Sequence, residues 1–172
     1  KINLVIDTYL RALTTVDIGY GGRDTIIDSL AEIYEGKQQE RLFEQVNARI
    51  QAELKPNPQN PSLVLSLAEV YFRQGRLDLA LENFKRLGPL YPADRGQILD
   101  KYAQILERDK NSKAADFYQT IITLFPNSPI AWNSQLKLAR LYDQIGRWQD
   151  ALVVLTNMTR QGNDPSVQLL LG

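Results

Sequence analysis

The sequence contains no cysteine and no histidine. Without cysteine the chain has no disulfide, no thiolate metal ligand and no thiol nucleophile. Without histidine it also lacks the most common general base and the most common metal ligand. These two absences disfavour most classes of enzyme. We therefore expect a protein with no catalytic residues, no metal site and no cofactor.

The chain also lacks an excess of charge of either sign and a long hydrophobic run. Lys and Arg total 20, as do Asp and Glu, so nothing in the net charge favours binding to nucleic acid or to an anionic membrane. No stretch approaches the ~18 apolar residues of a membrane span. Hydrophobic residues make up 44% of the chain, which is typical of a folded domain. We expect a soluble protein, cytoplasmic or periplasmic, or the soluble part of an anchored protein.

The stretch from Pro61 to Pro92 carries two apolar stripes of helical spacing, separated at Gly75. The stripes consist of Val64, Leu67, Ala68 and Tyr71, followed by Leu77, Ala80, Leu81, Phe84 and Leu87. Residues spaced three and four apart lie on one face of a helix. Glycine readily adopts the left-handed conformation that ends a helix. The pattern predicts two short helices that form a hairpin and bury their stripes against each other.

The same pattern recurs along the chain. The hexamer at 29–34 nearly copies the hexamer at 66–71, with isoleucine in place of valine. The first-helix signature begins at Ile27, Val64, Leu99 and Gln135, with successive separations of 37, 35 and 36 residues. Repetition at a fixed period of this length is typical of a repeat protein built from hairpins.

This pattern resembles the tetratricopeptide repeat, whose period is about 34 residues. The matching positions in the central hairpin are Val64, Leu67, Ala68, Tyr71, Ala80, Phe84 and Pro92. The tryptophan of the family pattern is missing there. The resemblance covers about residues 24–164 and implies an all-α fold, a right-handed α-solenoid of antiparallel helical hairpins.

Some repeats depart from the family pattern. Phe43 stands where the family has a small alanine, so the repeat at 24–60 is degenerate. In a later repeat, the residues at 109–111 take the place of the turn glycine. The expected organisation is an N-terminal helix (a partial repeat or cap) with a glycine-rich linker at 1–22, the degenerate repeat at 24–60, repeats at 61–94, 95–128 and 129–165, and the start of a further or capping helix at 166–172.

The resemblance also implies a peptide-binding groove on the concave side of the first helices, opposite the face that meets the partner helix. Helix phase at about 100° per residue places the groove positions. The expected groove residues are Asp28, Glu32, Glu35, Leu65, Glu69, Phe72, Arg73, Asp100, Gln104, Glu107, Arg108, Asn133, Leu136, Arg140, Asp143 and Gln144.

The charge of this expected groove restricts the partner. Acidic side chains outnumber basic ones, so a basic or polar segment is the better electrostatic match. Family members that hold a chaperone's C-terminal carboxylate use basic residues and asparagine on this face, and this chain departs from that pattern. Leu65 and Phe72 also lie on this face. They either anchor apolar side chains of a partner or pack on the neighbouring repeat.

We therefore expect a non-enzymatic scaffold that binds a peptide or a partner domain in an acidic concave groove, within a multiprotein assembly or a longer chain. One alternative is a structural spacer segment of a larger protein. Another is a member of the family that acts in envelope assembly, because the run from Phe125 to Pro129 is similar to that of such proteins. Nucleic acid, a membrane span and a chaperone carboxylate are not expected among the partners.

Overall fold

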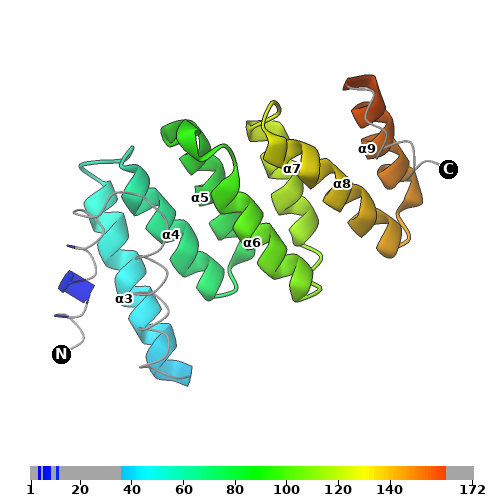
Figure 1. The fold of residues 1–172 in the computed structure, drawn as a ribbon. Helices are drawn as coiled ribbons and strands as arrows, with labels where there is room; N and C mark the ends of the chain where they lie inside the picture. Colours follow the sequence, from blue (N-terminus) through cyan, green and yellow to red (C-terminus); the bar gives the residue numbers. More distant parts are fainter. Residues whose placement is uncertain (1–3, 5, 9–10, 12–35, 162–172) are drawn as a thin grey trace. The chain divides into compact units, whose positions relative to one another are not determined.

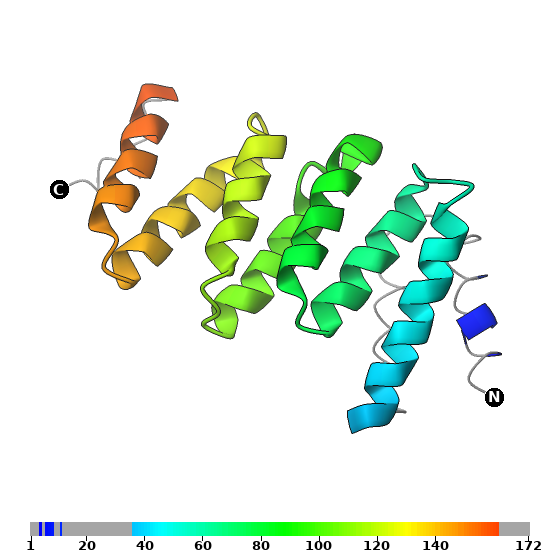
Figure 2. The same cartoon turned by 180° about the vertical axis from the view of Figure 1, so that it is seen from behind.

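The computed structural model describes residues 4, 6–8, 11 and 36–161, and regular structure within these ranges is helical (Figures 1 and 2). The predicted all-α class of antiparallel helical hairpins is confirmed for this part of the chain. The expected linker, the first helix of the degenerate repeat at 24–60 and the expected helix start at 166–172 lie outside the described residues. The boundaries of the individual repeats remain predictions.

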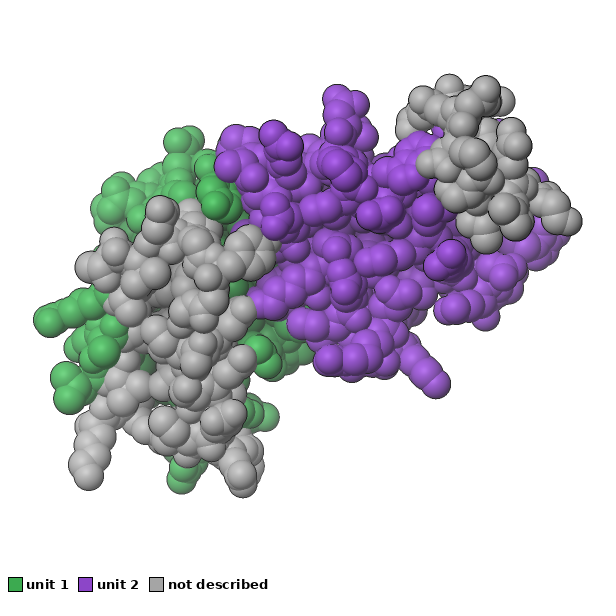
Figure 3. Space-filling model, viewed as in Figure 1, with its two compact units in different colours: residues 1–91 green, residues 92–172 purple. Residues whose placement is uncertain are grey.

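The chain divides into two compact units, residues 1–91 and residues 92–172 (Figure 3). In unit 1 the described helices are α3 (Gly36–Leu54), α4 (Pro61–Arg73) and α5 (Leu77–Leu90). Unit 2 contains the short 3₁₀ helix η1 (Pro92–Asp94), α6 (Gln97–Arg108), α7 (Ala114–Leu124), α8 (Pro129–Gln144) and α9 (Trp148–Gln161).

In unit 1, α4 packs against both α3 and α5. Nine consecutive residues of α4, 63–71, are buried, so this helix is covered on every face. Ala68 of α4 and Ala80 of α5 are fully buried, and small residues of this kind let two helices approach closely. Phe43 is also buried, on α3. Phe84 of α5 is the largest side chain of the α4–α5 hairpin with less than 2% of its surface exposed.

In unit 2, α6 packs on α7, α7 on α8 and α8 on α9. The largest fully buried side chains of this unit belong mainly to α7, namely Tyr118, Phe117 and Ile121. The α8–α9 hairpin has a core of its own, formed by Ala139, Ala151, Leu155 and Met158.

Helices α4 and α8 begin in the same way, with a polar N-cap followed by proline. The side chain of Asn60 accepts hydrogen bonds from the backbone N–H groups of Ser62 and Leu63, at 2.9 and 3.2 Å. The hydroxyl of Ser128 accepts one from the N–H of Ala131 at 3.0 Å. Proline suits the first helical position because its missing N–H would have no partner there. These local signals determine where both helices start.

Three hairpin turns share one geometry although only two of them contain glycine. Gly75, Lys110 and Gly146 have φ angles of 69°, 54° and 76°. In each turn the following residue donates its backbone N–H to the carbonyl oxygen five positions earlier, at 2.9, 2.8 and 2.7 Å. Lys110 therefore occupies the place of the turn glycine, and the α6–α7 turn keeps the helix ending that the other two turns have.

We expect Gly75→Ala to lower the free energy of unfolding by about 1 kcal/mol, measured by urea denaturation. A methyl group added at Gly75 would meet no atom within 4 Å, so the loss comes from the backbone conformation rather than from a clash. Lys110→Gly is the control, because it relieves strain at the equivalent position and should not destabilise the chain. Equal stability of Gly75→Ala and the wild type would contradict this account.

Candidate functional site

The residues of the expected groove in unit 1 are mostly inaccessible or undescribed. Asp28, Glu32 and Glu35 lie outside the described residues. Leu65 and Glu69 are only 3% and 6% exposed, so neither side chain is available to a partner in this structure. The remaining two, Phe72 and Arg73, are half-buried and exposed respectively. For Leu65, burial favours packing within the chain over contact with a partner.

The expected groove residues of α6 are engaged in bonds within unit 2. Lys137 of α8 donates to Asp100 at 3.2 Å, and Gln104 donates to the other oxygen of the same carboxylate at 2.6 Å. The hydroxyl of Tyr118 donates to Glu107 at 2.6 Å. Two of the acidic groups that we expected to attract a basic segment therefore already have partners in the chain. The next expected residue, Arg108, is exposed and lies beside Asp109.

Lys137 and Tyr118 join three helices into one polar network. The ammonium group of Lys137 lies over the ring of Tyr118, 5.2 Å from its centre, while it bonds to Asp100. Burial of Tyr118 raises the pKa of its hydroxyl well above the ordinary value of 10.0, and the hydrogen bond and charge of Glu107 add to this effect. The hydroxyl is thus held as a hydrogen-bond donor. Neither residue is among those that the sequence pattern predicts for the groove.

The expected residues on α8 are more accessible. Leu136 is half-buried, and the others, Asn133, Arg140, Asp143 and Gln144, are exposed. Arg140 and Asp143 also line a pocket between α8 and α9, of about 300 Å³. In the described part of the chain, this pocket brings two of the expected site residues together around a cavity.

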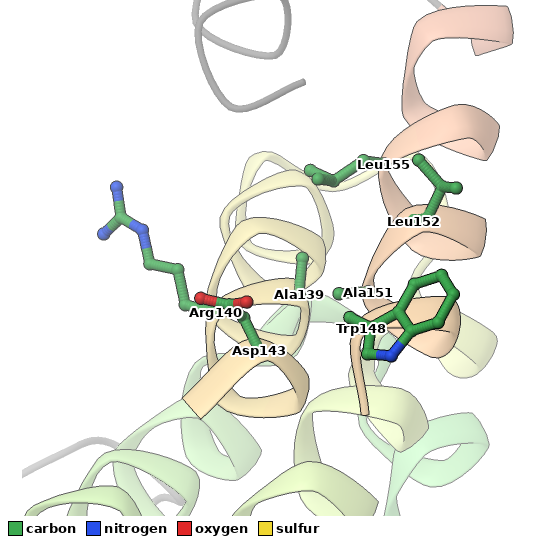
Figure 4. Close-up of a pocket in the computed structure, with 7 residues that line it drawn as sticks. All are labelled: Ala139, Arg140, Asp143, Trp148, Ala151, Leu152 and Leu155. Carbon is green, nitrogen blue, oxygen red and sulfur yellow. The ribbon is translucent and has the colours of Figure 1, made fainter. Parts of the chain in front are cut away.

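The pocket has an apolar wall and a charged edge (Figure 4). Its lining consists of Ala139, Arg140, Asp143, Trp148, Ala151, Leu152 and Leu155. Trp148 and Leu152 of α9 keep 63% and 49% of their surface exposed. In Figure 4 the side chain of Arg140 extends away from α9, so the charged edge lies on the α8 side.

The α9 wall is not part of the expected groove, although the sequence contains a signal for it. Ala151 and Leu155 belong to the buried stripe of this helix, and Trp148 lies on the same side at helical spacing. Leu152 and Val153 widen the apolar surface beyond one face, and both are exposed. A helix that has more apolar side chains than its hairpin partner can cover indicates a second contact surface.

The described part of the chain contains neither a candidate metal site nor a candidate membrane-spanning helix. Residues 36–161, with the few described positions before them, include no cluster of acidic residues that could hold a metal ion. Within the same residues, no helix has the length and apolar character needed to cross a membrane.

Residues 97–128, which include α6 and α7, match the family model described as tetratricopeptide repeat. The family that the sequence pattern resembles is therefore confirmed at this repeat. Repeats of this kind are typical of protein–protein interaction scaffolds without catalytic activity, and the match supports that general role. Among curated proteins, no sequence matches this chain.

Solved structures with a similar arrangement include the crystal structure of MamA, with a TM-score of 0.42 and 21% sequence identity over 72% of both chains. Another is a putative kinesin light chain from Podosopora anserina with nearly identical tetratricopeptide-like repeats. Its TM-score is 0.44 and its identity 19%, over 97% of this chain and 85% of that one.

Proposed function

We propose that this chain, in which residues 97–128 are a tetratricopeptide repeat, is a scaffold that holds a segment of a partner protein at the α8/α9 pocket. The observation that carries the proposal is the exposure of Trp148 and Leu152 beside a cavity of about 300 Å³. Large apolar side chains that stay exposed next to a pocket are typical of contact surfaces. Tryptophan is also among the residues that contribute most to binding energy.

The lining of the pocket suits a segment that brings one apolar side chain flanked by polar groups. The α9 wall would bury the apolar group, and the α8 edge offers one charge of each sign, from Arg140 and Asp143. A basic or polar segment remains the partner class that we propose, because a basic side chain beside Asp143 would meet an exposed carboxylate. The scaffold would act within a larger assembly.

The proposed contact surface includes fewer residues than the groove that the sequence predicts. Asp100 and Glu107 hold bonds within unit 2, and Leu65 and Glu69 are buried. We therefore assign partner contact to the exposed residues of α8 and α9 instead.

Leu152→Ala is expected to weaken the binding of a selected peptide about tenfold, a loss of about 1.4 kcal/mol. Peptides that bind the full chain would be selected from a displayed random library. The target chain would carry the substitution Trp132→Phe. The chain has two tryptophans, so Trp148 is then the only one and reports binding by a shift of its emission. The affinities would be measured by titrating this emission.

Val153→Ala is the matched control, since Val153 is 60% exposed on the same helix but does not line the pocket. It should leave the affinity unchanged. Two results would contradict the proposal: a library that yields no binder, or Leu152→Ala binding as tightly as Val153→Ala. Either would favour the structural-spacer alternative.

A further inference from the structure

On the preceding hairpin, the face that corresponds to the α8/α9 pocket is covered by the next helix of the same chain. Ala114 of α7 and Ala151 of α9 are equivalent positions 37 residues apart, and both are buried. Tyr118 corresponds in the same way to Leu155, which lines the pocket. Helix α8 packs on α7, also reaches α6, and places Lys137 over the ring of Tyr118. The segment that follows α9 is therefore the first candidate to cover the pocket.

The sequence after α9 repeats the pattern with which α8 begins. The run Asn-Ser-Pro at 127–129 recurs as Asn-Asp-Pro at 163–165, 36 positions later. In α8 the serine of this run is the N-cap and the proline is the first helical residue. Aspartate is an equally good N-cap. Residues 162–172 lie outside the described part of the chain, and the correspondence is one of sequence.

The buried positions in the first turns of α8 correspond to apolar residues in this segment. Across 36 positions, Ala131 corresponds to Val167, Ser134 to Leu170 and Gln135 to Leu171. In α8 the buried Oγ of Ser134 and Oε1 of Gln135 have no hydrogen-bond partner, which is unfavourable. Leucine at both positions has no polar atom to leave unpaired. The segment therefore suits a buried place of this kind better than α8 itself does.

We propose that residues 165–171 of this chain cover the α8/α9 pocket in the way that α8 covers its counterpart, and that a partner segment binds by displacing them. The inference rests on the proposed function and adds a regulation of the same site. Trp148 and Leu152, whose side chains are exposed, would be covered whenever no partner is bound. The apparent affinity for a partner is then reduced by the fraction of molecules in which the pocket is open.

The first test compares Leu170→Asp with Leu169→Asp in the full chain with Trp132→Phe, where Trp148 is the only tryptophan. The two leucines are matched, because Leu170 stands at a buried position of the α8 pattern and Leu169 at an exposed one. We expect Leu170→Asp to shift the emission of Trp148 to longer wavelength and to increase its quenching by acrylamide, since the covering segment leaves. Leu169→Asp should change neither.

The second test titrates the same two variants with the peptides selected on the chain. Leu170→Asp should raise the affinity about tenfold, because the pocket is open in nearly all molecules, and Leu169→Asp should leave it unchanged. A synthetic peptide of residues 163–172 should restore the original emission of the Leu170→Asp chain. It is added at about millimolar concentration, the effective concentration of a tethered segment.

Three results would overturn the inference. One is equal emission of the two aspartate variants. Another is an emission difference that depends on protein concentration, because the covering segment would then belong to a second copy of the chain. The third is a loss of peptide affinity in Leu170→Asp, since the segment would then contribute to binding instead of competing with the partner.

The variants Leu152→Ala and Val153→Ala, made in the Leu170→Asp chain, test the proposed function separately. If they bind the selected peptides equally while the emission of the two aspartate variants still differs, the proposed function fails and the covering of the pocket stands. If Leu152→Ala alone weakens binding while the two aspartate variants have equal emission, only the regulatory inference fails.

Discussion

Replacing Phe84 by alanine is expected to lower the free energy of unfolding by about 3–5 kcal/mol, more than any other single change considered for unit 1. Phe84 lies on α5 at the aromatic position of the repeat pattern and is only 1% exposed. Its removal would leave a cavity between α5 and its neighbours, because the packed side chains around it cannot fully collapse. Urea denaturation followed by circular dichroism would measure the loss.

Phe72→Ala is the control for this prediction. Phe72 lies on α4 of the same unit but is only half-buried, so the same truncation removes less buried surface there. The expected loss is well below that of Phe84→Ala. If both variants lost the same stability, the packing of the α4–α5 hairpin around Phe84 would not be the main source of the effect.

Tyr118→Phe is expected to destabilise unit 2 by about 2 kcal/mol, the usual size for a hydrogen bond to a charged group. The variant removes the hydroxyl that donates to Glu107 and keeps the ring under Lys137. A double-mutant cycle with Glu107→Ala, which removes the acceptor, would isolate the pair, because two residues in direct contact give non-additive losses. Additive losses in that cycle would show that the hydrogen bond contributes little.

The same variant should change the dependence of stability on pH. The pKa of Tyr118 is raised above its ordinary value of 10.0 in the folded chain, so the folded state keeps this proton after the unfolded state has released it. The contribution to the free energy of unfolding is complete below pH 10 and decreases as the pH rises above it. Tyr118→Phe should therefore show a shallower decrease in stability above pH 10 than the wild type does.

Much of the local structure could be predicted because its causes lie close together in the sequence. Helices α4 and α5 follow from apolar stripes at helical spacing, from Asn60 and Pro61 at the start, and from Gly75 at the turn. One local feature could not be predicted in detail. Lys110 adopts the backbone conformation of the turn glycine, which glycine adopts freely and lysine rarely does.

The candidate site was less accessible to prediction, because helix phase tells which residues share a face but not what packs on that face. Leu65 and Glu69 are at positions expected in the groove and yet are buried. Asp100 is on an accessible helix face by phase, but Lys137, 37 residues later, bonds to it. Contacts of this kind depend on how separate helices meet, and a periodic pattern within one helix does not contain that information.

By itself the sequence determined the helices, their hairpins and the repeated pattern, because spacing, caps and turn residues act over a few positions. It also determined the absence of cysteine and histidine chemistry. Only the tertiary structure decided which charged groups are paired within unit 2 and which apolar side chains remain exposed to solvent. The exposure of Trp148 and Leu152 depends on which faces of α9 find a partner helix, and that depends on how the helices pack together.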